Sequence, residues 1–409
     1  MNGNTSNKLK ILNDPIYGFI TIPSALICDL IDHPYFQRLR RISQMGLSYL
    51  VYPGAHHTRF HHAIGSMHLM QKAVRILRYK GIVISDEEET ALCIAILLHD
   101  IGHGPFSHAL EHSIIKGKTH EEISLRFMEA LNNDFKGKLS LAIEIFKGKY
   151  HRKFFNQLIS SQLDMDRLDY LNRDSFYTGV TEGNISSERL ITMLHVKNDQ
   201  LVIEEKGIYS VEKFIVARRL MYWQVYLHKT GLVAEKLLTK IVERAKELVA
   251  NGVELHAGKS FSYFLKENSS ENNFSNEALL IFSKLDDYDV LSAIKEWMEH
   301  DDFILSTLSS NLINRNLPKV VLQNEPFSAE ILLKIKKKVL KKISINEASL
   351  DYFMYHGEIM NQAYDLTKNN IKILYKNETT RDITKASDNL NIEALATPVN
   401  KYYLCYPKK

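Results

Sequence analysis

The chain is poor in the residues that mark cross-linked, secreted or membrane proteins. It holds three cysteines, Cys28, Cys93 and Cys405, and their wide spacing fits neither a disulfide framework nor a cysteine-type zinc site. The first residues contain no apolar stretch of the kind found in secretory signals, and the apolar run Ala91–Leu98 is too short to span a bilayer. We therefore expect a cytoplasmic protein that has no membrane partner.

A large excess of either charge is also absent. The formal net charge is +4, whereas modules that bind nucleic acid concentrate basic residues on one face. The charge therefore permits anionic ligands without favouring nucleic acid. The conspicuous basic run, Leu333–Ile343, carries apolar residues at helical spacing, so we interpret its lysines as the solvated face of a helix. Binding of nucleic acid or a protein partner is the alternative for this run.

The pattern of apolar residues predicts mostly helices, from residue 24 to about residue 300. Two capping boxes support this, Ser85 with Glu88 and Thr119 with Glu122, each at the start of an expected helix. A short hairpin turning at Asn198–Asp199 is also expected.

Beyond residue 250 the character of the sequence changes. The segment from Asn268 to Asn276 is polar and is expected to be a loop. After residue 317, short β-type runs beginning at Lys319, Ile371 and Tyr402 surround the lysine-rich helix. We therefore predict three regions: a core with its N-terminal segment at 1–250, a helical extension at 251–316, and a small α+β region at 317–409. With 45% hydrophobic residues, the chain has enough apolar side chains for a large core.

Four candidate metal ligands stand at separated points in helix-like sequence: His62, the pair His99 and Asp100, and Asp166. An ionised aspartate at the end of an apolar run is costly to bury unless a positive group compensates it. Imidazole and carboxylate ligands together suit Mn, Fe, Ni or Zn, and four protein ligands leave positions for water and substrate. The pattern predicts the metal site of a hydrolase.

Each of these residues also has a plainer interpretation. A single histidine in an apolar segment is more often a core residue with a satisfied hydrogen bond. The segment His99–His108 argues against packing alone, because it holds three histidines, an aspartate, two glycines and a proline. The nearby Asp164 and Asp169 are interpreted instead as residues that bind neighbouring helices.

An ordered set of motifs resembles the HD-domain phosphohydrolases and, among them, the deoxynucleoside triphosphate triphosphohydrolases. It covers roughly the first 230 residues and consists of Lys10–Gly18, Phe36–Arg40, Tyr52–Ala55, Arg59–His62, His99–His108, Thr119–Glu121, Asp164–Tyr170 and Tyr226–Lys229. The resemblance implies a mainly α-helical HD-domain fold, to which the small C-terminal α+β region is added.

The acid–base groups are predicted partly from the spacing of residues and partly from this resemblance. His108 and Glu111 are three residues apart, so in a helix the carboxylate would orient the imidazole. The family's catalytic histidine and its acidic partner fall on these two residues, and further pocket histidines fall on His103 and His120. An ordinary exposed His–Glu pair is the alternative. His120 would open its helix, where the dipole disfavours an imidazolium and welcomes phosphate.

The resemblance also implies a nucleotide pocket, formed by Gln44, Arg59, Tyr170, Asp174, Arg218 and Tyr226. The two arginines would hold phosphates by paired hydrogen bonds. Gln44, Tyr170 and Asp174 would surround the sugar, and the Tyr226 ring would exclude a ribose 2′-hydroxyl. Plainer roles are an ion pair for Arg218 and core packing for Tyr226.

The chain departs from the family pattern at several points. His61 and Ala63 flank the ligand histidine where the family usually has an acidic residue and a serine. Tyr222 stands where the eukaryotic relatives have a histidine, which puts base or phosphate contacts there in doubt. An N-terminal sterile-alpha-motif domain is missing, so we expect a minimal bacterial-type member.

In the eukaryotic relatives a guanine nucleotide binds between subunits and assembles a tetramer. The matching positions here are Lys10, Asn13, Asp32, Gln37, Arg40, His228 and Lys229. Asp32 would accept hydrogen bonds from a guanine edge, and Lys10 and Arg40 would meet phosphates. The alternative is that these side chains only pair locally on a solvated face. The resemblance thus implies a homo-oligomer, dimer or tetramer, with GTP or dGTP as activator.

The sequence therefore favours a metal-dependent hydrolase that converts dNTPs, each bound with Mg²⁺, to a deoxynucleoside and tripolyphosphate. Two alternatives stay open. One is an HD phosphohydrolase for another phosphate ester, such as a nucleoside monophosphate or cyclic nucleotide. The other is a nucleotide-sensing or nucleic-acid-binding protein with a vestigial HD site.

Overall fold

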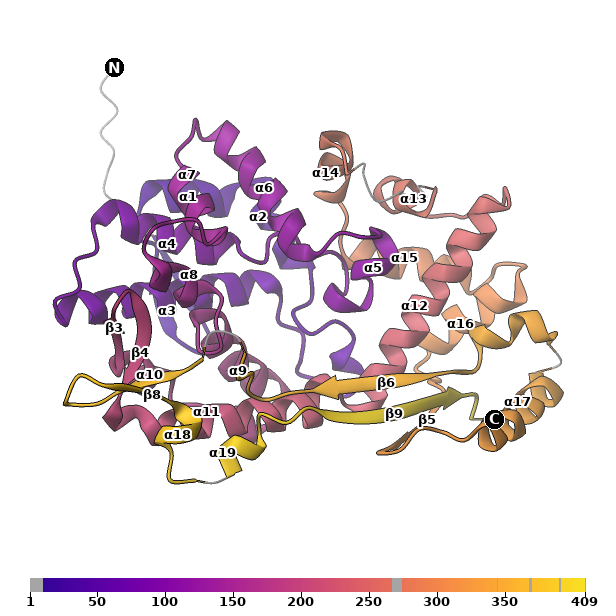
Figure 1. Ribbon diagram of the computed structural model, residues 1–409. Helices are drawn as coiled ribbons and strands as arrows, with labels where there is room; N and C mark the ends of the chain where they lie inside the picture. Colours follow the sequence, from indigo (N-terminus) through magenta and orange to yellow (C-terminus); the bar gives the residue numbers. More distant parts are fainter. Residues whose placement is uncertain (1–9, 267–273, 344, 368–369, 390, 409) are drawn as a thin grey trace, which may run out of the picture.

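The computed structural model describes residues 10–266, 274–343, 345–367, 370–389 and 391–408, and only the backbone of His108, His112 and Asn391. These residues form a mainly α-helical fold with small sheets, as the sequence predicts (Figure 1). Most of the segment expected to be a loop after Asn268 lies outside the described residues. Within them, no helix combines the length and apolarity that crossing a bilayer requires.

The first group of helices carries the site. α3 runs through its centre and packs against α4 and α9. The bounds are α1 (Ala25–Asp32), α2 (Pro34–Gln37), α3 (Arg59–Tyr79), α4 (Asp86–Leu98), α5 (Glu111–Ile114), α6 (His120–Asp134), α7 (Ser140–Phe146), α8 (Lys153–Ile159), α9 (Met165–Thr178) and α10 (Ser187–Thr192).

Local chemistry sets where the site-bearing helices begin. α4 and α6 start at the predicted capping boxes, in which Ser85 and Thr119 each exchange hydrogen bonds with a glutamate three residues later. α4 then buries every residue of Ala91–Leu98 and ends with His99 as its C-cap, so the packing of the helix fixes the position of His99. Both predicted helix starts are confirmed.

A second group of helices follows the first along the chain. Its bounds are α11 (Ile208–Met221), α12 (Lys229–Ala250), α13 (Lys259–Lys266), α14 (Asn276–Phe282), α15 (Asp287–Trp297), α16 (Phe303–Ile313), α17 (Ala329–Ile343), α18 (Ile383–Ala386) and α19 (Asn391–Ala394). The predicted lysine-rich helix is α17, and Val339 is its one buried residue among those described. Figure 1 shows α13 to α17 at the end of the molecule away from α1 and α3.

The strands form three sheets among the described residues. They are β1 (Ile11–Asp14) with β2 (Gly18–Thr21); β3 (Leu194–Lys197), β4 (Gln200–Glu204), β7 (Lys372–Leu374) and β8 (Thr380–Asp382); and β5 (Lys319–Gln323), β9 (Val399–Tyr406) and β6 (Tyr355–Asn361). The predicted hairpin is confirmed: Asn198 and Asp199 both have positive φ between antiparallel β3 and β4. Because β7 pairs in parallel with β4, the C-terminal region is joined to the predicted core region 1–250.

A buried arginine holds the loop that follows α4. Arg38 is fully buried and donates to the carbonyl oxygens of Ile101 (2.8 Å), His103 (2.9 Å) and Leu285 (3.2 Å). A buried cation with several main-chain acceptors fixes the backbone around it. The loop that carries Asp100 and His103 is thereby tied to the segment before α15.

Candidate metal centre and nucleotide pocket

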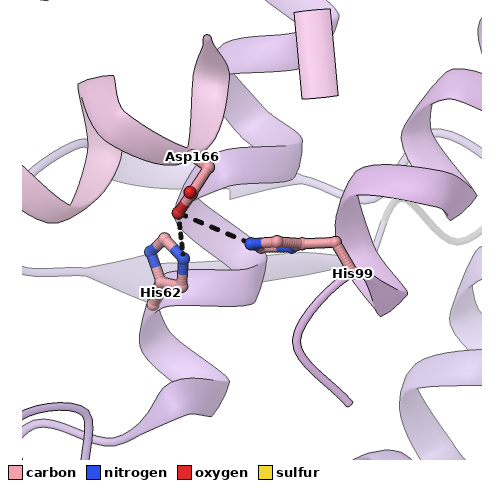
Figure 2. A group of neighbouring side chains, drawn as sticks. All are labelled: His62, His99 and Asp166. Atoms are coloured by element: carbon pink, nitrogen blue, oxygen red, sulfur yellow. Dashed lines mark ion pairs between the residues drawn. The ribbon is translucent and has the colours of Figure 1, made fainter. Parts of the chain in front are cut away.

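Three of the four predicted metal ligands converge from different helices. His62 comes from α3, His99 follows α4, and Asp166 lies in the first turn of α9. Oδ1 of Asp166 lies 3.0 Å from Nε2 of His62 and 3.5 Å from Nε2 of His99. Figure 2 shows both rings directed at this carboxylate. The ligand atoms of the three residues lie within 4.8 Å of one another, close enough to share a cation.

The outer nitrogens of both histidines fix which nitrogen faces the centre. Nδ1 of His62 lies 2.7 Å from Oδ2 of Asp169, and Nδ1 of His99 lies 2.6 Å from the carbonyl oxygen of Ile96. Both oxygens can only accept, so each Nδ1 carries a proton, and Nε2 is the nitrogen left to bind a metal. Neither buried Nε2 has a hydrogen-bond partner, which is the arrangement a metal ligand requires.

Asp100 lies at the edge of this cluster. Its Oδ1 is 3.4 Å from Nε2 of His99, and its Oδ2 is 3.8 Å from Nε2 of His62. The same carboxylate pairs with Nη1 of Arg59, which also donates from Nε to Ser107 at 2.8 Å. Asp100 is therefore placed to bind a metal on one side and an arginine on the other.

The electrostatics of the cluster favour a cation. Burial lowers the pKa of His62, but Asp166 and Asp169 outweigh burial and raise it to about 10. Burial raises the pKa of Asp166, but His62 and His99 outweigh it and hold that pKa well below its usual range. The carboxylates are thus ionised at neutral pH and attract positive charge. The donor types, the inward-facing Nε2 atoms and the negative charge all fit a divalent transition metal.

A second group of polar side chains lies next to the first. The rings of His103 and His120 stack with centroids 3.9 Å apart, and Nε2 of His103 lies 3.5 Å from Oδ1 of Asp100. Oε1 of Glu111 accepts from the backbone nitrogen of His120 at 2.8 Å and lies 2.7 Å from its Nδ1. Glu111 thus orients His120, a pairing that the sequence did not indicate. The side chain of His108 lies outside the described residues.

The two stacked imidazoles have opposite pKa shifts. Burial lowers the pKa of His103 well below its usual value, and the charge of Arg59 adds to this. Burial also disfavours charge on His120, but the hydrogen bond to Glu111 outweighs it and raises the pKa. At His120 the Glu111 carboxylate thus opposes the effect expected from the helix dipole. Two adjacent imidazoles whose pKa values are shifted in opposite directions suit acid–base chemistry on a phosphate ester.

A cavity of about 420 Å³ opens beside both clusters. Five of the six predicted nucleotide contacts line it: Gln44, Arg59, Tyr170, Asp174 and Tyr226. Within it, Oδ2 of Asp174 accepts a hydrogen bond of 2.7 Å from the hydroxyl of Tyr226. The sixth, Arg218, is not among the lining residues; it donates to the carbonyl oxygen of Ala363 and lies against the ring of Tyr222, which does line the cavity.

Known proteins resemble this chain in both sequence and fold. Residues 59–174 match the HD domain, and residues 185–257 match the HD associated region. The crystal structure of a phosphohydrolase from Bacteroides thetaiotaomicron is 51% identical, covers 98% of this chain and 100% of its own, and superposes with a TM-score of 0.94. This chain belongs to the HD-domain phosphohydrolases.

Two curated relatives differ in what their names state. The uncharacterised protein YwfO of Bacillus subtilis is 39% identical over 330 residues, which is 77% of this HD-domain chain and 72% of YwfO. A protein of Dictyostelium discoideum named deoxynucleoside triphosphate triphosphohydrolase SAMHD1 homolog is 31% identical over 271 residues, 62% of this chain and 52% of its own length. This chain therefore spans about half of the Dictyostelium protein.

The structure of this HD-domain protein adds pocket residues that sequence reasoning missed. Arg167 lines the cavity from α9, pairs with Asp164 and has a buried Nε without a hydrogen-bond partner. Its position next to Asp166 was a signal that could have found it. Glu235 also lines the cavity, and burial raises its pKa to about 7. Nothing in the sequence around Glu235 distinguishes it from other helical glutamates.

The residues matched to an activator site lie mainly around α1 and α2. Nζ of Lys10 binds Asp32 at 2.6 Å, and both side chains are exposed. Nε2 of Gln37 donates to the carbonyl oxygen of Ile31 at 2.7 Å, and Nε of Arg40 donates to Gln37 at 2.9 Å. Asn13 lies in β1, and His228 and Lys229 lie at the start of α12. Lys10, Asp32, Gln37 and Arg40 are thus paired locally, and a nucleotide would have to replace these contacts.

Proposed function

We propose that this protein hydrolyses deoxynucleoside triphosphates to a deoxynucleoside and tripolyphosphate. One observation carries the proposal: a single cavity is lined by two of the proposed metal ligands, by both stacked histidines and by the residues expected around the sugar. These are Asp100 and Asp166; His103 and His120; and Gln44, Tyr170 and Asp174. The name of the Dictyostelium relative supports the choice of substrate. The intact set of metal-ligand side chains argues against a vestigial site.

Different side chains would hold the metal and neutralise the phosphate charge. His62, His99, Asp100 and Asp166 would hold a Mn, Fe, Ni or Zn ion, which supplies a Lewis acid for a phosphoryl oxygen. Arg59 and Arg167 neutralise phosphate charge, alongside the Mg²⁺ that accompanies the triphosphate.

The bond that breaks lies between the α-phosphorus and O5′ of the sugar. Water attacks the phosphorus, tripolyphosphate keeps the new oxygen, and O5′ leaves with a proton as the 5′-hydroxyl of the deoxynucleoside. His103, His108 and His120, oriented in part by Glu111, are the groups that transfer these protons.

A substrate panel tests the proposal. The purified protein with Mn²⁺ or Mg²⁺ is incubated with each dNTP, each NTP, several monophosphates and a cyclic nucleotide, and the phosphate products are identified. Tripolyphosphate from dNTPs is the expected result. Orthophosphate from monophosphates would replace the proposal with an HD phosphohydrolase of another ester.

The Tyr226 ring should set the preference for deoxyribose. Tyr226→Ala removes the ring that would crowd C2′, and we expect the ratio of kcat/KM for NTPs to that for dNTPs to rise about tenfold or more. Tyr226→Phe keeps the ring and loses only the hydrogen bond to Asp174, so it is the matched control. Equal sugar selectivity in Tyr226→Ala and wild type would remove Tyr226 from this role.

We propose further that GTP or dGTP activates the enzyme by assembling dimers into a larger homo-oligomer. We expect a guanine nucleotide to raise both the mass of the protein and the rate of hydrolysis of the other dNTPs, the rate by about fivefold or more, because a ligand that binds the larger, more active oligomer better shifts the population toward it. Light scattering and rate measurements with and without the nucleotide check this. A mass and a rate that both ignore it would reject activation and leave the hydrolytic proposal standing.

A further inference from the structure

A line of buried charged groups joins the N-terminal hairpin to the metal centre. Asp14 ends β1, and its Oδ2 accepts from Nη1 of Arg173 at 2.8 Å. Arg173 binds Asp169 with two hydrogen bonds of 2.9 Å, from Nε and from Nη2. Asp169 in turn lies 2.7 Å from Nδ1 of His62. A chain of three contacts therefore connects the hairpin to His62, a proposed metal ligand.

The groups of this line have no access to water. The side chains of Arg173 and Asp169 are 0% exposed, and that of Asp14 is 4% exposed. A buried guanidinium that loses one carboxylate partner is left incompletely compensated, which strongly disfavours the arrangement. The position of Asp169 therefore depends on Asp14 as well as on Arg173.

α3 has a glycine where this line crosses it. A Cβ at Gly65 would lie 2.1 Å from Oδ1 of Asp169 and 2.2 Å from Nη2 of Arg173. Both contacts are too short for any side chain, so Gly65 is what allows the ion pair to lie directly against the helix that carries His62. The line is thus part of how α3 and α9 fit together.

Asp14 has a second task in the hairpin. Its Oδ1 accepts from the backbone nitrogens of Ile16 at 2.9 Å and Tyr17 at 3.0 Å, which closes the turn between β1 and β2. The guanidinium of Arg173 lies 5.6 Å from the centre of the Tyr17 ring. The Asp14 carboxylate therefore stabilises the turn through Oδ1 and binds Arg173 through Oδ2.

We infer that Asp14 and Arg173 are positioning residues of the metal centre. Together they hold Asp169 so that Nδ1 of His62 keeps its proton and Nε2 faces the metal. The inference rests on the proposed metal ligands and concerns metal binding. It therefore holds whichever phosphate ester the enzyme hydrolyses, and failure of the dNTP proposal would not affect its test.

The test is Mn²⁺ titration of the chelator-treated full-length protein, followed by electron paramagnetic resonance, together with thermal melting. Asp14→Asn keeps an acceptor for the turn but has no charge for Arg173. We expect its Mn²⁺ affinity to fall about tenfold, at the lower end of what outer partners of metal ligands contribute.

Asp302→Asn is the matched control. Asp302 also closes a turn, accepting from the backbone nitrogen of Leu305 at 2.8 Å, and also pairs with an arginine, Arg244, at 2.5 Å. It caps α16, which carries none of the proposed ligands. A lowered melting temperature in both variants, with weaker Mn²⁺ binding only in Asp14→Asn, is the expected result.

Wild-type Mn²⁺ affinity in Asp14→Asn would overturn the inference and leave Asp14 a purely structural residue. If Asp14→Asn does not fold, Asp14→Ser replaces it, because a serine hydroxyl can also accept from the turn nitrogens. The same comparison of Mn²⁺ affinity with Asp302→Asn then decides.

Discussion

Replacing Asp166 by asparagine should abolish tight metal binding and reduce dNTP hydrolysis by about 10³-fold or more. Oδ1 of Asp166 lies near Nε2 of both His62 and His99, at 3.0 and 3.5 Å. An amide of the same shape cannot supply the negative charge that balances a divalent cation. Loss of the metal's stabilisation of the transition state, several kcal/mol, accounts for an effect of this size.

Elemental analysis and circular dichroism of the purified variant check this prediction. The helix content should be unchanged, because Asp166 lies at the pocket edge of α9 and contributes no apolar packing. Asp302→Asn, remote from the ligands in sequence, should keep both metal and activity. Full metal content in Asp166→Asn would show that the proposed ligand set is wrong.

The second large effect is expected at His108. His108→Ala should retain the metal and bind dNTP, yet lose turnover by about 10² to 10⁴-fold, the usual contribution of an acid–base group. His356→Ala is the matched control, because His356 is an exposed histidine on β6, outside the pocket. Single-turnover rates and metal content are measured for both variants.

Unchanged turnover in His108→Ala would transfer the acid–base role to the stacked pair of His103 and His120. Glu111→Gln would then be the informative variant, since Glu111 holds Nδ1 of His120 at 2.7 Å. The two outcomes separate a dyad of His108 and Glu111 from one of His120 and Glu111.

Sequence reasoning succeeded where the determinants are local. The starts of α4 and α6 follow from side chains three residues apart, and the β3–β4 turn follows from two residues that tolerate positive φ. The family resemblance placed five of six expected nucleotide contacts on one cavity.

It did less well where a contact joins distant segments. Asp169 binds a neighbouring helix, as interpreted, but its spacing from Asp166 gave no sign that the partner is His62, 107 residues away. The link from Asp14 to Arg173 spans 159 residues. The pKa of His120 was expected to be low from the helix dipole, because the partner that raises it, Glu111, is brought close only by the fold.

The association of β7 with β4 is a further example. The runs after residue 317 have β character on their own, but their sequence does not indicate which strand each one pairs with. The parallel pairing of Ile203 with Ile373 joins the C-terminal region to the HD core through tertiary structure alone.

The central claim, attack of water at the α-phosphorus of a dNTP, is tested most directly by hydrolysis in H₂¹⁸O with mass spectrometry of both products. The proposed reaction predicts one ¹⁸O atom in tripolyphosphate and none in the deoxynucleoside, because the bond from the α-phosphorus to O5′ breaks. Labelled orthophosphate or pyrophosphate, with a nucleoside di- or monophosphate as the other product, would contradict it.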